Sequence, residues 1–139
     1  MRTPRVLAVA LATAALLVLT GLPAQAGSPH FVDDQTTLSV DGNTLTVVGK
    51  IAGLGDEDQV HVVLSADAAC YNRGGNKPAA ENKEAVLAEG DFPVQNGKAT
   101  FTLSGTATFD PSAPCPVPLE IRYTNVVVTD TTHGISVNL

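Results

Sequence analysis

Apolar and polar residues alternate along most of the chain that follows residue 26, and this alternation predicts β-strands. Successive side chains of a strand point to opposite faces, so an alternating segment has one buried and one solvent-facing side. The clearest example lies between residues 59 and 70, where Cys70 continues the buried phase. The apolar members of this segment are Val60, Val62, Leu64, Ala66 and Ala68.

A first β-hairpin is predicted at Asp41-Gly42. This dipeptide favours the positive φ angles of a two-residue loop. Such a loop sets Leu38 opposite Leu45, so that their side chains share one face. A three-residue loop would mix the apolar and polar faces, and we therefore expect the shorter loop.

A second hairpin is predicted at Asn96-Gly97, where a two-residue loop would set Phe92 opposite Phe101. Pro93 conflicts with this register, because proline has no N–H group to donate to the ladder. Either the pairing in this hairpin ends after a few rungs, or the loop is wider than two residues.

The number and length of the strands predict the fold class. About seven short strands with tight turns fit an all-β, two-layer antiparallel sandwich of immunoglobulin-like kind better than a barrel. The proline-rich stretch 110–118 is expected to be irregular, because its prolines cannot join a central ladder. Two last strands are expected over residues 119–129 and 135–139.

The first 26 residues have the features of a signal peptide. Arg2 and Arg5 form a basic start, an apolar run follows over residues 6–19, and Ala24-Gln25-Ala26 is a cleavage site. The other reading, an uncleaved membrane anchor, is disfavoured because the apolar run is too short. We therefore expect a secreted, extracellular product that forms one domain over residues 27–139 and has no membrane attachment after cleavage.

Charge restricts the partners of this product. The chain has 8 basic and 14 acidic residues and a net charge of −6. Cleavage removes Arg2 and Arg5, so 6 basic and 14 acidic residues remain and the net charge becomes −8. A domain of that sign repels phosphate backbones and anionic lipids, and we expect no nucleic-acid partner.

The only two cysteines are Cys70 and Cys115. In an exported protein such a pair is expected to form a disulfide. A reactive free thiol or a metal-binding pair is the alternative, but neither cysteine has a histidine or a third cysteine near it in sequence.

The longest stretch without a strand pattern is the polar segment 71–83, which begins next to Cys70. Long loops in compact domains often carry function, so this segment is the first candidate for a contact surface. An equally weighted alternative is a simple connection between sheets, steadied by the disulfide. The candidate contact residues are Tyr71, Asn72, Arg73, Asn76, Lys77, Asn82 and Lys83.

The acidic turn Asp56-Glu57-Asp58 offers oxygen ligands for calcium. Calcium takes six to eight oxygens, and the EF-hand spacing is absent, so a solvated acidic turn is favoured over a metal site. The three histidines, His30, His61 and His133, show no metal-binding spacing and are interpreted as surface residues.

No pattern in the sequence indicates catalysis. A Gly-x-Ser-x-Gly elbow is absent, and both cysteines are assigned to the disulfide, so no activated nucleophile is evident. We therefore expect a secreted non-enzymatic binding module, without a cofactor, that contacts an extracellular protein or a component of the cell envelope. A structural component of the envelope is the alternative, and an enzyme of unknown type is third.

Several segments are similar to a group of small secreted actinobacterial proteins. The similarity is carried by Ala-Gly-Leu-Gly-Asp at 52–56, Cys-Tyr-Asn-Arg-Gly-Gly-Asn-Lys-Pro at 70–78 and Tyr-Thr-Asn-Val-Val-Val-Thr-Asp-Thr-Thr at 123–132. It implies export, a β fold and paired cysteines, and it implies no particular activity.

Overall fold

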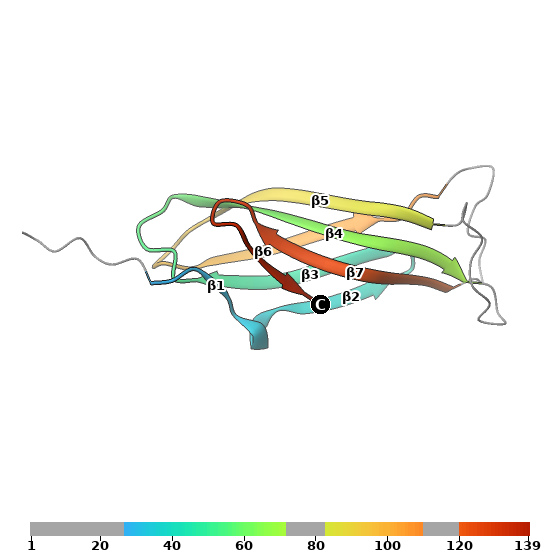
Figure 1. Cartoon of the computed structure of the whole chain (residues 1–139), viewed down its shortest axis with the longest axis horizontal. Coiled ribbons are helices and arrows are strands. Elements are labelled where there is room, and N and C mark those ends of the chain that lie inside the picture. Colours follow the sequence, from blue (N-terminus) through green and yellow to red (C-terminus); the bar gives the residue numbers. More distant parts are fainter. Residues whose placement is uncertain (1–26, 72–82, 110–119) are drawn as a thin grey trace, which may run out of the picture.

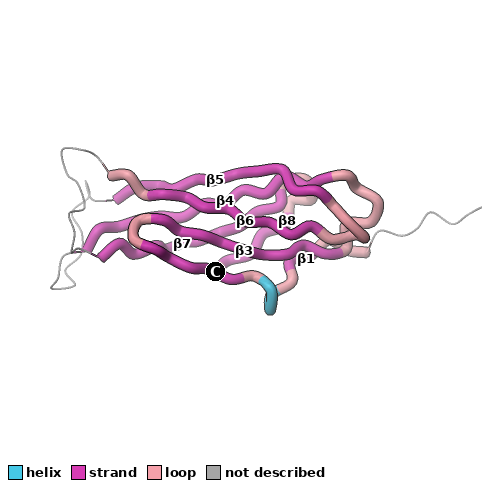
Figure 2. The backbone as a smooth tube through the Cα atoms, turned by 180° about the vertical axis from the view of Figure 1, so that it is seen from behind, coloured by secondary structure: helices cyan, strands magenta, loops and turns pink. Residues whose placement is uncertain are grey.

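The computed structural model describes residues 27–71, 83–109 and 120–139. Two antiparallel sheets pack face to face as a sandwich (Figure 1), with strands running along the length of the molecule (Figure 2). No helix among these residues is long and apolar enough to cross a membrane. The elements are β1 (His30–Phe31), the short 3-10 helix η1 (Asp33–Gln35), β2 (Thr37–Asp41), β3 (Thr44–Ala52), β4 (Gln59–Tyr71), β5 (Lys83–Pro93), β6 (Ala99–Thr106), β7 (Glu120–Asp130) and β8 (Ile135–Asn138).

The all-β, two-layer antiparallel architecture expected from the alternation is confirmed. In the first sheet, β6 pairs with one edge of β3, while β1 and β2 pair with successive parts of its other edge. The second sheet has the order β5-β4-β7-β8. The described residues form eight strands where about seven were expected, because the short β1 had no visible alternation.

The core lies between the sheets and is formed by the apolar phases of the strands. All five alternating apolar residues of β4 are at most 5% exposed, as the sequence predicted. Gly49 of β3 lies opposite Phe101 of β6, and a Cβ atom at this glycine would lie 2.4 Å from the Phe101 ring. The absence of a side chain at Gly49 therefore gives the ring its space.

The first hairpin has a two-residue loop, but the predicted position of that loop is wrong by one residue, and the predicted register is therefore wrong as well. Asp41 pairs with Thr44, so the two loop residues are Gly42 and Asn43. Gly42 has φ +60°, as the first loop residue of a type II′ turn requires. Leu38 consequently lies opposite Val47 and not opposite Leu45.

The second hairpin turns at Asn96-Gly97, as predicted, with positive φ at both residues. Its pairing ends after the single bridge between Gln95 and Lys98. This confirms the alternative in which the pairing stops early and the loop has two residues. Beyond this bridge the strands enter different sheets, with β5 on β4 and β6 on β3. The Phe92 and Phe101 rings therefore meet between the sheets, with their centroids 6.1 Å apart.

At the end of the sandwich that contains the β2–β3 turn, Tyr123 links the two sheets. Its hydroxyl, on β7, donates a hydrogen bond to the Asn43 carbonyl oxygen at 2.5 Å. Ala107 and Asn43 also bond twice, Ala107 N to Asn43 O at 2.9 Å and Asn43 Nδ2 to Ala107 O at 3.0 Å. Burial raises the pKa of the Tyr123 hydroxyl, which keeps it a donor.

Candidate functional site

The described ends of the predicted contact loop lie side by side. Tyr71 ends β4 and Lys83 begins β5, and Ala69 pairs with Lys83. The other five candidate residues of that loop, Asn72, Arg73, Asn76, Lys77 and Asn82, lie outside the described residues.

Tyr71 stacks with a charged neighbour on β7. The Arg122 guanidinium lies 4.3 Å from the centroid of the Tyr71 ring, a cation–π distance. The Arg122 guanidinium donates two hydrogen bonds to the Glu120 carboxylate, from Nε to Oε1 and from Nη2 to Oε2, each at 3.1 Å. These hydrogen bonds raise the pKa of Arg122 and lower that of Glu120, so both side chains are charged at neutral pH.

A depression of about 450 Å³ adjoins these loop ends. Its lining includes Ala69 and Ala85, whose small side chains occupy little space. In the same lining, Asn125 has φ 50° and donates from Nδ2 to Asp67 Oδ2 at 2.8 Å. The lining residues are Asp67, Ala68, Ala69, Tyr71, Lys83, Glu84, Ala85, Thr124 and Asn125.

Glu84, also at this depression, is already occupied by backbone amides. Its Oε2 accepts hydrogen bonds from Thr108 N at 2.9 Å and Phe109 N at 2.5 Å, and its Oε1 accepts from the Thr108 hydroxyl at 3.1 Å. Phe109 has a positive φ of 49°. Glu84 therefore fixes the segment after β6 and is not a free ligand.

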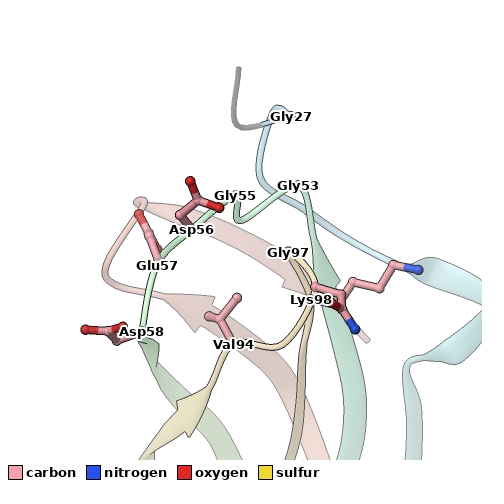
Figure 3. A pocket seen from close by; sticks show the side chains of 10 residues that line it. Gly27, Gly53, Gly55, Asp56, Glu57, Asp58, Val94, Gly97 and Lys98 are labelled. Atoms are coloured by element: carbon pink, nitrogen blue, oxygen red, sulfur yellow. The ribbon is translucent and has the colours of Figure 1, made fainter. Parts of the chain in front are cut away.

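The acidic turn lies at the opposite end of the sandwich, beside a second depression of about 630 Å³ (Figure 3). The side chains of Asp56 and Asp58 point in different directions in this view. Glu57 bonds a histidine, and the Asp58 carbonyl oxygen accepts from Val94 N at 2.9 Å. Within the described ranges, no group of three or more His, Cys, Asp or Glu side chains could hold a metal ion.

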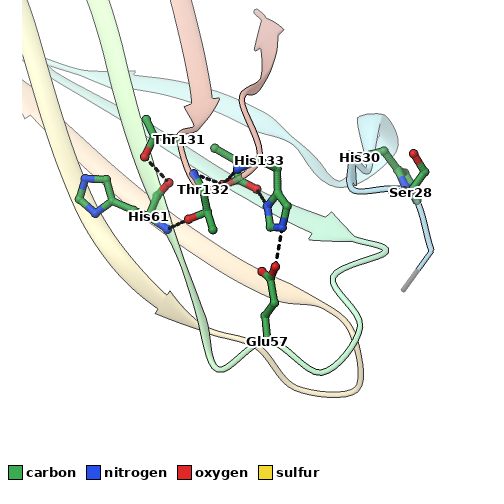
Figure 4. Close-up of polar contacts among 8 residues, drawn as sticks. Ser28, His30, Glu57, His61, Thr131, Thr132 and His133 are labelled. Atoms are coloured by element: carbon green, nitrogen blue, oxygen red, sulfur yellow. Dashed lines mark hydrogen bonds and ion pairs between the residues drawn. The ribbon is translucent and has the colours of Figure 1, made fainter. Parts of the chain in front are cut away.

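His133 is held between two carboxylates, an arrangement that the sequence reading missed (Figure 4). Its Nδ1 lies 2.6 Å from Asp130 Oδ2, and its Nε2 lies 2.8 Å from Glu57 Oε1. The Asp130 side chain is fully buried, and its Oδ1 also accepts from Thr132 N at 2.9 Å and His133 N at 3.3 Å. The Asp-x-x-His spacing at the β7–β8 turn was the available signal, because aspartate often caps such a turn.

The two carboxylates determine the protonation of His133. Burial disfavours its charged form, but the hydrogen bonds to Asp130 and Glu57 outweigh burial and raise the pKa of His133. An imidazolium with both N–H groups bonded to carboxylates has no nitrogen available as a base. The three side chains therefore form a clamp, which we call the His133 clamp, between the β7–β8 turn and the acidic turn.

The other two histidines make separate contacts. His61 Nδ1 lies 2.8 Å from Asp91 Oδ1 on the outer face of β4, and this hydrogen bond raises the pKa of His61. His30 Nδ1 donates to the Ser28 carbonyl oxygen at 2.8 Å. The structure therefore does not bring the three histidines together.

Cys70 lies at the end of β4 with 2% of its surface exposed. It packs in a small apolar cluster with Phe109, the last described residue before position 110. Cys115 lies outside the described residues, so the pairing of the two cysteines stays a prediction.

Comparison with known proteins gives no relative. No family model, curated protein or solved structure matches the chain.

Proposed function

We propose that the chain is a secreted, non-enzymatic binding module. The observation that carries the proposal is the depression at Tyr71 and Lys83, whose lining combines three alanines with charged, polar and aromatic side chains. Tyr71 and Lys83 line it, and the Arg122 guanidinium stacks on the Tyr71 ring beside it, so an aromatic side chain and two cationic ones gather here on an otherwise acidic protein. Such a surface suits an extracellular protein or an envelope component with acidic or polar groups.

The chemistry of the polar clusters supports a role without catalysis. Asp130, the most buried carboxylate among the described residues, bonds the β7–β8 turn through both of its oxygens, and both nitrogens of His133 are bonded. A general base needs a nitrogen or oxygen free to accept a proton from substrate. Neither Asp130 nor His133 offers one in this arrangement.

We further propose an immunoglobulin-like arrangement and a Cys70–Cys115 disulfide. In support of the arrangement, β3 and β6 lie in one sheet with the N-terminal strands, and β4 and β7 lie in the other with β8 at its edge. In support of the disulfide, the buried Cys70 packs near Phe109, which is only a short stretch of chain before Cys115.

The contact surface is tested by filling the depression. Ala85→Arg places a long side chain in its lining, while Leu87→Arg adds the same side chain two positions along the same face, where Leu87 is 66% exposed. Each immobilised variant is incubated with the culture fluid and cell-wall fraction of the source, and retained proteins and glycans are compared. The proposal expects a ligand that the unmodified protein and Leu87→Arg retain and Ala85→Arg loses. Equal retention by all three proteins would exclude this depression as the contact surface.

A further inference from the structure

Strand β2 lies at the edge of its sheet, on the opposite sheet from the depression discussed above. It pairs with β3 on one side, and no described strand pairs with its other side. We call this side the β2 edge. An unpaired edge offers backbone groups to an additional strand.

The apolar side chains of β2 face inward but stay exposed. Leu38 and Val40 lie opposite Val47 and Leu45, which are fully buried, yet they are themselves 41% and 44% exposed. Leu38 and Val40 are exposed because, at this edge, no described strand of the second sheet covers them.

The position of β8 explains the missing cover. β8 pairs only with residues 127–130 of β7, the half of the sandwich where β1 lies. β2 pairs with residues 44–48 of β3, and the bond from Tyr123 to Asn43 places that half of β3 beside the first half of β7. Beyond the end of β8, no described strand pairs with that edge of β7 to cover β2. Figure 1 shows β8, in dark red, ending partway along β7.

The backbone of β2 is open at the same two residues. Across a two-residue loop the flanking residues form a hydrogen-bonded pair, here Asp41 with Thr44. Hydrogen-bonded and non-bonded pairs alternate along an antiparallel ladder, so the N–H and C=O groups of Leu38 and Val40 point away from β3. Each of these residues thus presents an exposed apolar side chain and backbone groups that no described strand pairs with.

Carboxylates flank the β2 edge. Asp33 and Asp34 precede β2 on η1, and Asp41 ends it. All three are exposed, and no ion pair within the described part of the chain involves them. A binding partner at this edge is therefore favoured if it carries positive charge.

We propose that the β2 edge binds an extended segment of a partner protein in which apolar side chains alternate with lysine or arginine. The segment adds a strand to β2, and its apolar side chains cover Leu38 and Val40. A second copy of this chain fits less well. Antiparallel pairing of two β2 strands would bring the carboxylates of both copies to one edge, and acidic residues outnumber basic ones in each copy, 14 against 8.

The probe is a capped seven-residue peptide of alternating valine and lysine, titrated into the isotope-labelled protein and followed by NMR. The expected result is slowed hydrogen exchange at the Leu38 and Val40 amides, with weaker effects elsewhere. One control peptide has the same composition with its valines and lysines in separate blocks, and another alternates valine with glutamate. Neither control should protect the two amides.

Two protein variants separate the apolar and charge contributions. The double substitution Leu38→Thr and Val40→Thr removes apolar contact while keeping strand-forming residues, and should weaken peptide binding about tenfold or more. The matched control is Leu87→Thr, at an exposed leucine of the other sheet. Neutralising Asp33, Asp34 and Asp41 to asparagine should weaken binding several-fold and reduce its dependence on salt.

Three results would overturn the proposal. One is equal binding of the alternating and the block peptide, since charge alone would then explain both. Another is binding that leaves the exchange of the Leu38 and Val40 amides unchanged. The third is protection of these amides in the free protein that grows with protein concentration, which would make the β2 edge an interface between two copies. The Ala85→Arg variant should bind the peptide normally, so failure here is distinguishable from failure of the proposed contact surface.

Discussion

Replacing His133 by glutamine should lower stability most at acidic pH. Glutamine keeps a polar side chain of similar length but cannot supply two charged donors to Asp130 and Glu57. Hydrogen bonds between charged groups contribute about 1.5–3 kcal/mol each, and the bond to the fully buried Asp130 should dominate. We expect a loss of about 2–3 kcal/mol below pH 6 and a fall in Tm of roughly 10 °C.

The pH dependence follows from the direction of the pKa shift. The pKa of His133 is raised in the folded protein above its ordinary value of 6.5. Its contribution to the free energy of unfolding is therefore fully present below pH 6.5 and is lost as the pH rises through the folded-state pKa. The difference in stability between the unmodified protein and His133→Gln should shrink over that range.

The assay is chemical denaturation at a series of pH values from about 5 to 9. His61 also has a raised pKa and titrates in the same direction, but it is present in both proteins, so its contribution cancels in the difference. Parallel stability profiles for the two proteins would refute the reasoning, because they would show that folding does not raise the pKa of His133.

Three further predictions concern stability. Gly49→Ala should cost about 1–3 kcal/mol, because the new methyl group overlaps an aromatic ring, and thermal melts should show a lower Tm. Glu84→Ala should cost about 1–3 kcal/mol by leaving two backbone amides without their acceptor, whereas Glu89→Ala, on the same strand but exposed, should change denaturation midpoints little. Reduction of the proposed bond between Cys70 and Cys115 should lower stability by up to about 4 kcal/mol, and intact mass measured with and without reductant checks whether the bond exists.

Strands with a strict alternation were predictable because every second residue along them had to be buried. In β4 the buried phase from Val60 to Cys70 was read directly from the sequence, and the structure confirms it. β1 was not predicted, since a two-residue strand is too short to alternate.

Registers at turns were less predictable, because several residues near a turn tolerate positive φ. Asp41-Gly42 and Gly42-Asn43 are both plausible two-residue loops, and the structure has the second. Both registers put Leu38 and Val40 on the face of Leu45 and Val47, so the alternation could not decide between them. In the second hairpin, Pro93 did indicate where pairing ends, but the entry of β5 and β6 into different sheets depends on contacts distant in sequence.

The polar clusters depended most on the tertiary structure. Glu57 and His133 are 76 residues apart, so no local pattern could pair them. Tyr71 was singled out as the start of a long loop, whereas its contact with Arg122 required the pairing of β4 with β7.

The bond from Tyr123 to Asn43 also limits when the domain can fold during synthesis. It joins the first hairpin of the chain to the seventh strand, 80 residues later. β4 likewise needs β7 as its partner, so the second sheet is incomplete until the last part of the sequence is available. Because such distant contacts form slowly and late, a chain still emerging from the ribosome has neither its second sheet nor its inter-sheet link. The complete sandwich therefore cannot form before β7 has been made.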